Sequence, residues 1–296
     1  MKRIIVSTLL VLATASLLFA GGASEDATIN VAAQDVNETV ILANMAKIII
    51  EENTPYEATV NTNFTGSSVL HQAMVGGEID VYPTWTGTQL TGVLRYEGPN
   101  LSGEETFRRV KEGFEDSFGF TWTEPFGFNN TYVLVVRRET AEEFDLEVSS
   151  DLAPYAADWR LAGDDNYDTR PDAYPGWREH YGIEFAEVLP MSYGLIYRAI
   201  DQGEVDVAAA YATDSRIEKL DLVLLEDDQE FFPDYSGAYV VSDRVIEEYP
   251  DVIEALNVLS GMIPTEEMIS LNSRYDDGEE ADIIAREWLE ANGVID

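Results

Sequence analysis

"SVLHQAMVGGEIDVYPTW", residues 68–85, is echoed without a gap by "GLIYRAIDQGEVDVAAAY", residues 194–211. In both stretches apolar residues at helical spacing are followed by Gly-Glu, a branched apolar residue, Asp and Val. Each stretch therefore predicts a helix that leads into a strand. Because this unit occurs twice, far apart in one chain, the sequence predicts two similar lobes rather than a solenoid, unless the match is a chance likeness of two amphipathic helices.

Strands and helices alternate around the first copy. The patterns predict strands over 28–33, 56–61 and 78–82 and helices over 38–51 and 67–76. Such alternation is typical of an open, mostly parallel α/β sheet, so the predicted fold class is α/β. Ligands of these sheets collect at the carboxyl ends of the strands, which is where Trp-Thr-Gly-Thr, residues 85–88, is expected to form a turn.

Two segments are predicted to carry the chain between the lobes. The first is the Pro/Gly-rich stretch 124–130, and the second is "DDQEFFPDYSGAYVVSD", residues 227–243, which precedes a run of helices. The predicted division is therefore lobe 1 from 23–128 plus 233–296, and lobe 2 from 129–232.

The N-terminus has the pattern of a secretory signal peptide. Lys2 and Arg3 precede an apolar run that ends in small residues, which predicts a signal peptide over 1–22, cleaved after Ala20 or Gly22. No cysteine follows the apolar run, so we expect a periplasmic protein without a lipid anchor. An uncleaved membrane anchor is the alternative.

The composition limits the partners of the chain. The formal charge of −38 makes nucleic acid and anionic membranes poor partners. Without cysteine, stability must come from a packed core. So acidic a surface suits a protein that works in strong salt, and equally an ordinary acidic exported protein.

Catalysis and metal binding find little support. The chain has no cysteine, and its two histidines, His71 and His180, form no evident pair with a nucleophile. A hydrolase that uses two carboxylates remains an alternative. The acidic loop at 164–168 offers oxygen ligands but lacks the glycine and terminal glutamate of a calcium-binding loop, so a solvated loop is favoured and neither metal nor cofactor is predicted.

Large aromatic residues stand beside several predicted strand ends. They are Trp85, Tyr132, Tyr211 and Tyr235. Each alone could be a core residue, but together their ring faces would attract a quaternary ammonium group, which cannot donate hydrogen bonds. Thr88 is near enough in sequence to Trp85 to contact a polar tail of the same ligand.

Five segments together resemble one protein family, the periplasmic substrate-binding proteins of ABC importers for osmoprotectants such as glycine betaine and choline. They are "GGEIDVYPTWTGT" (76–88), "GFNNTYVLVV" (127–136), "RPDAYPGWREHYGIEF" (170–185), "GEVDVAAAYATDSRI" (203–217) and "LVLLEDDQEFFPDY" (222–235). The resemblance implies a two-lobed periplasmic binding protein fold of type II with its ligand cleft between the lobes. It also implies a monomer without enzymatic activity that delivers its ligand to a membrane permease driven by a separate ATPase.

The resemblance also implies the site residues. The aromatic cage falls on Trp85, where the family usually has tyrosine, and on Tyr132, Tyr211 and Tyr235; the polar contacts fall on Gln34, Thr88, Asn130 and Arg170. Gln34 stands where lysine is common in the family, which leaves room for choline, whereas Arg170 favours a ligand carboxylate. Two alternatives stay open: Arg170 could form an ion pair with its aspartate neighbours, and the trap could serve an amino acid or a polyamine.

Overall fold

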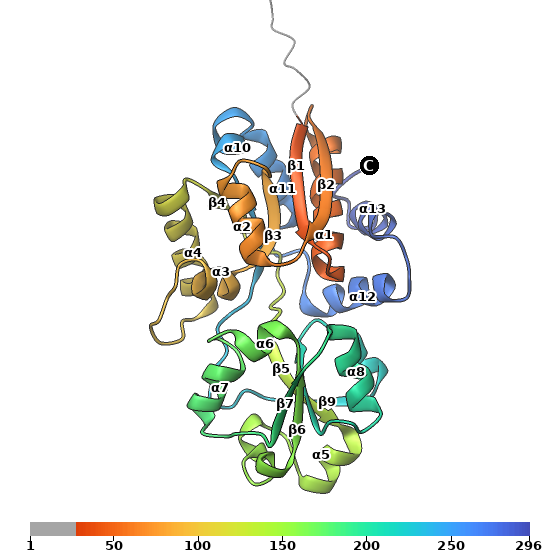
Figure 1. The fold of residues 1–296 in the computed structure, drawn as a ribbon. Helices are drawn as coiled ribbons and strands as arrows, with labels where there is room; N and C mark the ends of the chain where they lie inside the picture. The colour runs from red at the N-terminus through yellow and green to blue at the C-terminus, as the bar shows by residue number, and fades with distance from the viewer. Residues whose placement is uncertain (1–27) are drawn as a thin grey trace, which may run out of the picture.

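The computed structural model describes residues 28–296, and the predicted signal peptide over 1–22 lies outside them. Two five-stranded sheets, each with its own helices, are stacked end to end (Figure 1). Within 28–296, no helix combines the length and apolar character needed to cross a bilayer. The predicted α/β fold with two lobes is confirmed.

The first lobe contains sheet one, in the order β2-β1-β3-β10-β4. β1 pairs in parallel with β2 and β3, and β10 is antiparallel to β3 and β4. Its elements are β1 (Thr28–Gln34), α1 (Asn37–Asn53), β2 (Glu57–Phe64), α2 (Ser67–Val75), β3 (Val81–Trp85), α3 (Thr86–Gly92), α4 (Gly103–Phe118), β4 (Thr121–Trp122), β10 (Gly237–Val241), α10 (Asp243–Glu248), α11 (Asp251–Leu256), η3 (Asn257–Leu259), α12 (Thr265–Asp276) and α13 (Ala281–Ala291).

The second lobe contains sheet two, in the order β7-β6-β8-β5-β9. β6 pairs in parallel with β7 and β8, and β5 is antiparallel to β8 and β9. Its elements are β5 (Tyr132–Arg137), α5 (Arg138–Phe144), η1 (Ser149–Leu152), η2 (Ala156–Asp158), β6 (Arg160–Gly163), α6 (Asp165–Thr169), α7 (Tyr174–Tyr181), β7 (Glu187–Pro190), α8 (Tyr193–Asp201), β8 (Val207–Tyr211), α9 (Arg216–Lys219) and β9 (Leu222–Leu225).

The repeated sequence unit occupies the same place in both lobes. The first copy forms α2 and β3, and the second forms α8 and β8. β3 lies between a parallel and an antiparallel neighbour, and so does β8. Trp85 and Tyr211, which follow the shared motif in the two copies, are the last residues of these two strands.

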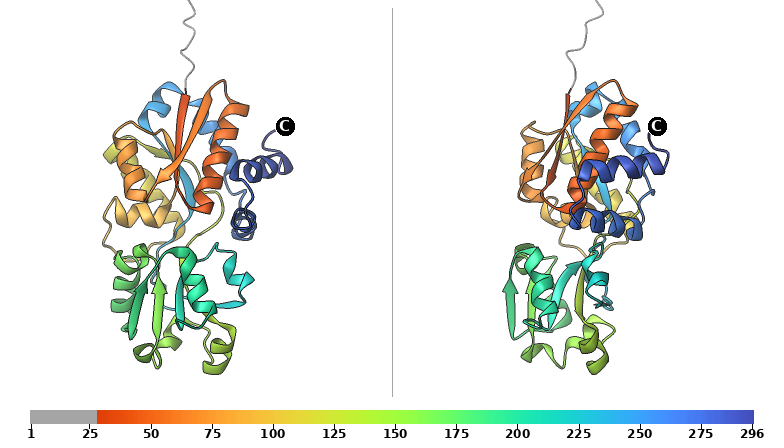
Figure 2. Two further views of the ribbon diagram at one scale, coloured as in Figure 1. Left: turned by 45° about the vertical axis from the view of Figure 1, so that its right-hand side comes forward. Right: turned by 90° about the vertical axis from the view of Figure 1, so that its right-hand side faces the viewer.

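Two chain segments join the sheets, one between β4 and β5 and one between β9 and β10 (Figure 2). They are hydrogen-bonded to each other: Asn129 forms an antiparallel bridge with Ser236, and the amide of Asn130 donates to the carbonyl of Tyr235 at 3.2 Å. The two lobes are therefore linked by a short pair of bonded strands at one side of the molecule.

The ends of the described chain meet in the core of the first lobe. α1 is buried along most of its length and packs against α12 and α13. The apolar residues of this helix therefore face protein on several sides. The helix predicted over 38–51 is confirmed and extends over 37–53.

The predicted strand at 78–82 lies instead at 81–85, and Asp80 just before it is bonded to Asn30 both through its backbone N–H and through its carboxylate, each at 2.8 Å. The predicted turn at 85–88 is wrong, since α3 begins at Thr86, directly after β3. Contacts with the second crossing support this helix. Thr86 Oγ1 donates to the carbonyl of Asp234 at 2.9 Å, and Gly87 lies so close that a Cβ there would be 2.7 Å from that carbonyl oxygen.

Candidate functional site

A cavity of about 150 Å³ lies between the lobes, and all eight residues predicted for the site line it. A single water molecule needs about a tenth of this volume, so the cavity is large enough for a small solute. The site includes strand-end residues of both sheets, as expected for open α/β sheets. Ten further residues line it, among them Glu38, Ser67, Asp164, Tyr193, Thr213 and Asn272.

Tyrosine rings form one wall of the cavity. Tyr132 begins β5 and Tyr211 ends β8, and the two are direct partners across these antiparallel strands. Their ring centroids are 5.0 Å apart at an interplanar angle of 33°. Tyr235 meets the Tyr132 ring edge-on at 5.7 Å, and Tyr193 lies 5.1 Å from Tyr211. Burial raises the pKa of the Tyr132 and Tyr235 hydroxyls, so both rings stay uncharged and electron-rich.

Trp85 reaches the cavity from the first lobe. It is the last residue of β3 and packs against the cores of both lobes. Its indole Nε1 donates to Glu38 Oε1 at 2.8 Å, which fixes the orientation of the ring. Four aromatic side chains therefore reach one cavity from the first lobe, the second lobe and the second crossing.

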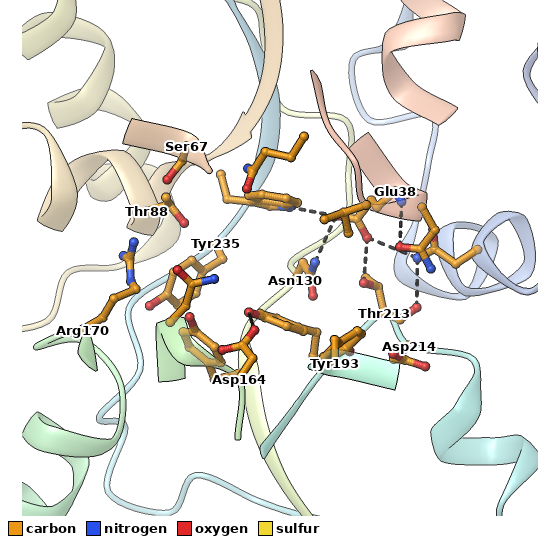
Figure 3. A pocket seen from close by; sticks show the side chains of 18 residues that line it. Glu38, Ser67, Thr88, Asn130, Asp164, Arg170, Tyr193, Thr213, Asp214 and Tyr235 are labelled. Atoms are coloured by element: carbon orange, nitrogen blue, oxygen red, sulfur yellow. Dashed lines mark hydrogen bonds between the residues drawn. The ribbon is translucent and has the colours of Figure 1, made fainter. Parts of the chain in front are cut away.

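Arg170 lies at one end of the cavity, near Thr88 and Ser67 (Figure 3). Its Nε and Nη2 donate to the two oxygens of Asp172 at 2.9 and 2.6 Å, and Nη2 also donates to Thr91 at 3.1 Å. Arg170 therefore forms an ion pair with a neighbouring aspartate, Asp172, which is the alternative that the sequence left open. This edge of the guanidinium cannot also grip a ligand carboxylate as a bidentate clamp, which leaves Nη1 as the group that has no protein acceptor within residues 28–296.

Asn130 presents an acceptor to the cavity. Its Nδ2 donates to Glu38 Oε1 at 3.0 Å, so its Oδ1 faces away from Glu38 (Figure 3). Oδ1 is buried and has no hydrogen-bond partner among the described residues. The two other predicted polar residues lie at element ends: Gln34 closes β1, and Thr88 is in the first turn of α3.

Glu38 is the main residue that the sequence reasoning missed. It is 1% exposed and accepts hydrogen bonds from Thr213, Trp85, Asn272 and Asn130. Burial raises the pKa of its carboxyl, and the four donors oppose that rise. A signal was available, because Glu38 stands in the first turn of the helix after β1, just as Thr88 stands in the first turn of the helix after β3.

The charges around the cavity favour a cation. Asp214 pairs with Arg216 at 2.5 Å, and Arg170 pairs with Asp172. Glu38 and Asp164 have no salt-bridge partner within the described chain; Asp164 accepts instead from the Tyr211 hydroxyl at 2.9 Å. Across residues 28–296 no group of three acidic or histidine side chains is placed to hold a metal ion.

The sequence echo could have revealed two more lining residues. Extended by one position towards the N-terminus, it aligns Ser67 with Tyr193, and both line the cavity at the start of their helices. Asn272 has no local signal. It belongs to α12 and reaches the site only through the packing of the C-terminal helices.

Comparisons with known proteins agree with this geometry. The chain is 36% identical over 296 residues to the carnitine transport binding protein OpuCC of Listeria monocytogenes, covering 99% of this chain and 96% of that protein. It is 29% identical to a glycine-betaine-binding protein of Pseudomonas aeruginosa, covering 100% and 97% of the two chains.

The solved structures include a glycine betaine/carnitine/choline ABC transporter protein, which matches with a TM-score of 0.78 at 34% identity and covers 90% of this chain and 100% of its own. Proteins of this kind are solute-binding components of ABC importers outside the cytoplasm, working with a permease and an ATPase, and they are not enzymes. Residues 27–291 match the substrate-binding domain of ABC-type glycine betaine transport systems, and the chain belongs to that family.

Proposed function

We propose that this protein captures a quaternary ammonium osmoprotectant, such as glycine betaine, choline or carnitine, in the cavity between its lobes. The single observation that carries the proposal is the convergence of Trp85, Tyr132, Tyr211 and Tyr235 on that cavity. Aromatic ring faces attract a quaternary ammonium group electrostatically without offering it hydrogen bonds.

The distribution of polar groups suits a ligand with two different ends. Glu38 places a buried carboxyl group without a cationic partner on one side of the cavity, while Arg170 and Thr88 lie on the other (Figure 3). The ammonium group would lie against the rings on the Glu38 side. A carboxylate or hydroxyl tail would extend towards Thr88, Gln34 and the free Nη1 of Arg170, in a monodentate contact.

A primary amine suits this cavity less well. A primary ammonium group has three N–H donors and needs an acceptor for each when it is buried. The two oxygens of Glu38 already accept two bonds each, and Asp164 Oδ2 is bonded to Tyr211. An amino acid or polyamine would therefore lose more hydrogen bonds to water than it gains.

The division of the chain and its export complete the proposal. Residues 23–128 with 233–296 form one lobe and 129–232 the other, and the lobes close on the ligand by bending at the two crossings. The mature protein is periplasmic and monomeric, is released by cleavage of the signal peptide over 1–22, and has no lipid anchor. The match of the family model from residue 27 onwards supports a leader that ends before it.

Calorimetric titration of the mature protein with glycine betaine, choline and putrescine tests the proposal. We expect micromolar or tighter binding of at least one quaternary ligand and none of putrescine. Binding of glycine betaine but not choline would show that the site also binds the carboxylate, despite the Arg170–Asp172 pair. Binding of choline but not glycine betaine would show that the site recognises only the ammonium group. If neither quaternary ligand binds, or if putrescine binds more tightly than both, the osmoprotectant assignment is overturned.

A further inference from the structure

Glu38 is a buried carboxylate that connects four separate parts of the chain. It lies in the first turn of α1, and no lysine or arginine within residues 28–296 neutralises it. A buried charge is tolerated only when hydrogen bonds replace its lost hydration. Glu38 meets this condition with four donors from four separate parts of the chain, so removal of any one donor leaves the charge less well satisfied.

The two oxygens of this carboxylate have different partners. Oε1 accepts from two predicted ligand-binding residues, Trp85 at 2.8 Å and Asn130 at 3.0 Å. Oε2 accepts from Thr213 at 2.7 Å and from Asn272 at 3.3 Å. One carboxylate therefore holds two predicted ligand-binding residues through one oxygen and two other lining residues of the cavity through the other (Figure 3).

Of the four donors, Thr213 is the one that comes from the body of the second lobe, whereas Asn130 lies in the first crossing, where that lobe begins. Thr213 lies two residues beyond the end of β8, and its carbonyl oxygen accepts from Asn272 Nδ2 at 3.1 Å. Both bonds cross from the first lobe to the second, so they exist only while the lobes lie together. Trp85 and Asn272 bond to Glu38 within the first lobe, and Asn130 does so from the first crossing, so these three bonds do not need the body of the second lobe.

We propose that Glu38 is a positioning residue through which lobe closure stabilises the ligand-binding cage. When the lobes meet, the hydroxyl of Thr213 completes the hydrogen bonds of the carboxylate, which then holds the indole of Trp85 and the amide of Asn130 in their ligand-binding orientations. Opening removes this donor and loosens both. The inference rests on the proposed function, since it assigns Trp85 and Asn130 to the ligand.

Thr213→Val tests the link with the smallest change, because it removes the hydroxyl and keeps the shape. Stopped-flow tryptophan fluorescence with glycine betaine and with choline separates association from dissociation. We expect dissociation to accelerate about tenfold, as for loss of one hydrogen bond to a charged group, with association changed less than about twofold. Thr213→Ser should restore the wild-type rate, and Thr59→Val, on an exposed position of β2, serves as the matched control.

Glu38→Gln provides a second readout that a merely structural role would not move. It should accelerate dissociation and also shift the tryptophan emission of the bound state, because Trp85 loses its charged acceptor. Wild-type dissociation rates in Thr213→Val would overturn the proposal even if Glu38→Gln fails to fold.

The proposed function can fail separately from this inference. If the wild-type protein binds no quaternary ligand, the proposed function is rejected. The hydrogen bond between Thr213 and Glu38 is then tested on the ligand-free protein by small-angle X-ray scattering. A larger radius of gyration in Thr213→Val than in the wild type and Thr59→Val would support the interlobe bond. Equal radii would overturn it.

Discussion

Tyr132 and Tyr211 face each other across neighbouring antiparallel strands, with their ring centroids 5.0 Å apart at the strand ends that meet the cavity. The pairing is a property of the sheet register, and it fixes two rings of the proposed cage on rigid backbone. Sites built on strands hold their side chains more accurately than sites on loops.

Removal of a ring should weaken binding without unfolding the protein. We expect Trp85→Ala or Tyr211→Ala to cost about 1 to 2 kcal/mol or more of binding free energy, the range of a desolvated cation–π contact. Calorimetry with choline measures the loss, and thermal melts check the fold. Tyr155→Ala is the control, because this ring stacks on Trp159, outside the cavity. Wild-type affinity in either cage variant would show that the cage is placed wrongly.

Arg170 should contribute to stability as well as to binding. Its side chain is 19% exposed and that of Asp172 is 5% exposed, so Arg170→Ala leaves a buried carboxylate without its cation. We expect a loss of about 2 to 4 kcal/mol in the free energy of unfolding, measured with urea. Asp172→Asn added to Arg170→Ala should recover part of this loss. Arg178→Ala breaks an exposed pair with Glu184 and should cost less than about 1 kcal/mol. Equal losses in the two single variants would refute a structural role for the buried pair.

Choline binding should weaken in mild acid. Burial raises the pKa of Glu38 above its ordinary value of 4.5, so the carboxylate gains its proton at a higher pH than a free glutamate. A bound cation favours the ionised form, and affinity therefore falls as pH decreases through the raised pKa. Calorimetry between about pH 7 and 4.5 follows this, since choline keeps its charge throughout. The fall should disappear in Glu38→Gln, and an unchanged fall there would assign it to another group.

The raised pKa of Glu38 has the opposite effect on the stability of the ligand-free protein. A carboxyl with a raised folded pKa contributes stability that is fully present below its unfolded pKa and is lost as pH rises through the folded value. Glu38 should therefore lower the unfolding free energy of the ligand-free protein at neutral pH while it supports binding there. Urea unfolding of the wild type and Glu38→Gln across the same pH range measures this contribution.

The unpartnered oxygen of Asn130 should select for a hydroxyl group on the ligand. Oδ1 is a buried acceptor, and a bound hydroxyl would satisfy it. L-carnitine should therefore bind more tightly than its deoxy analogue γ-butyrobetaine, by about 1 kcal/mol. Asn130→Ala should remove the difference between the two ligands while retaining the cage. If the variant discriminates as well as the wild type, the hydroxyl contacts another residue.

The sequence allowed the fold to be predicted because its strongest signals are local. The echo located β3 and β8, and with them Trp85 and Tyr211, since both residues end equivalent strands. Boundaries that depend on distant contacts were missed, such as the start of β3 beside Asp80 and Asn30. The same holds for the interactions of Glu38, whose four partners come from parts of the chain that only the folded structure brings together.

The interruption of the first lobe by the second also sets the order in which the chain can mature. Sheet two is complete once residues 132–225 have emerged, whereas sheet one still lacks β10, and α1 still lacks its cover from α12 and α13. During synthesis, domains fold as continuous units as they become available. The apolar helix α1 precedes the helices that cover it by more than 200 residues and is therefore among the last segments to be buried, and it is the segment that a chaperone would need to shield in the meantime.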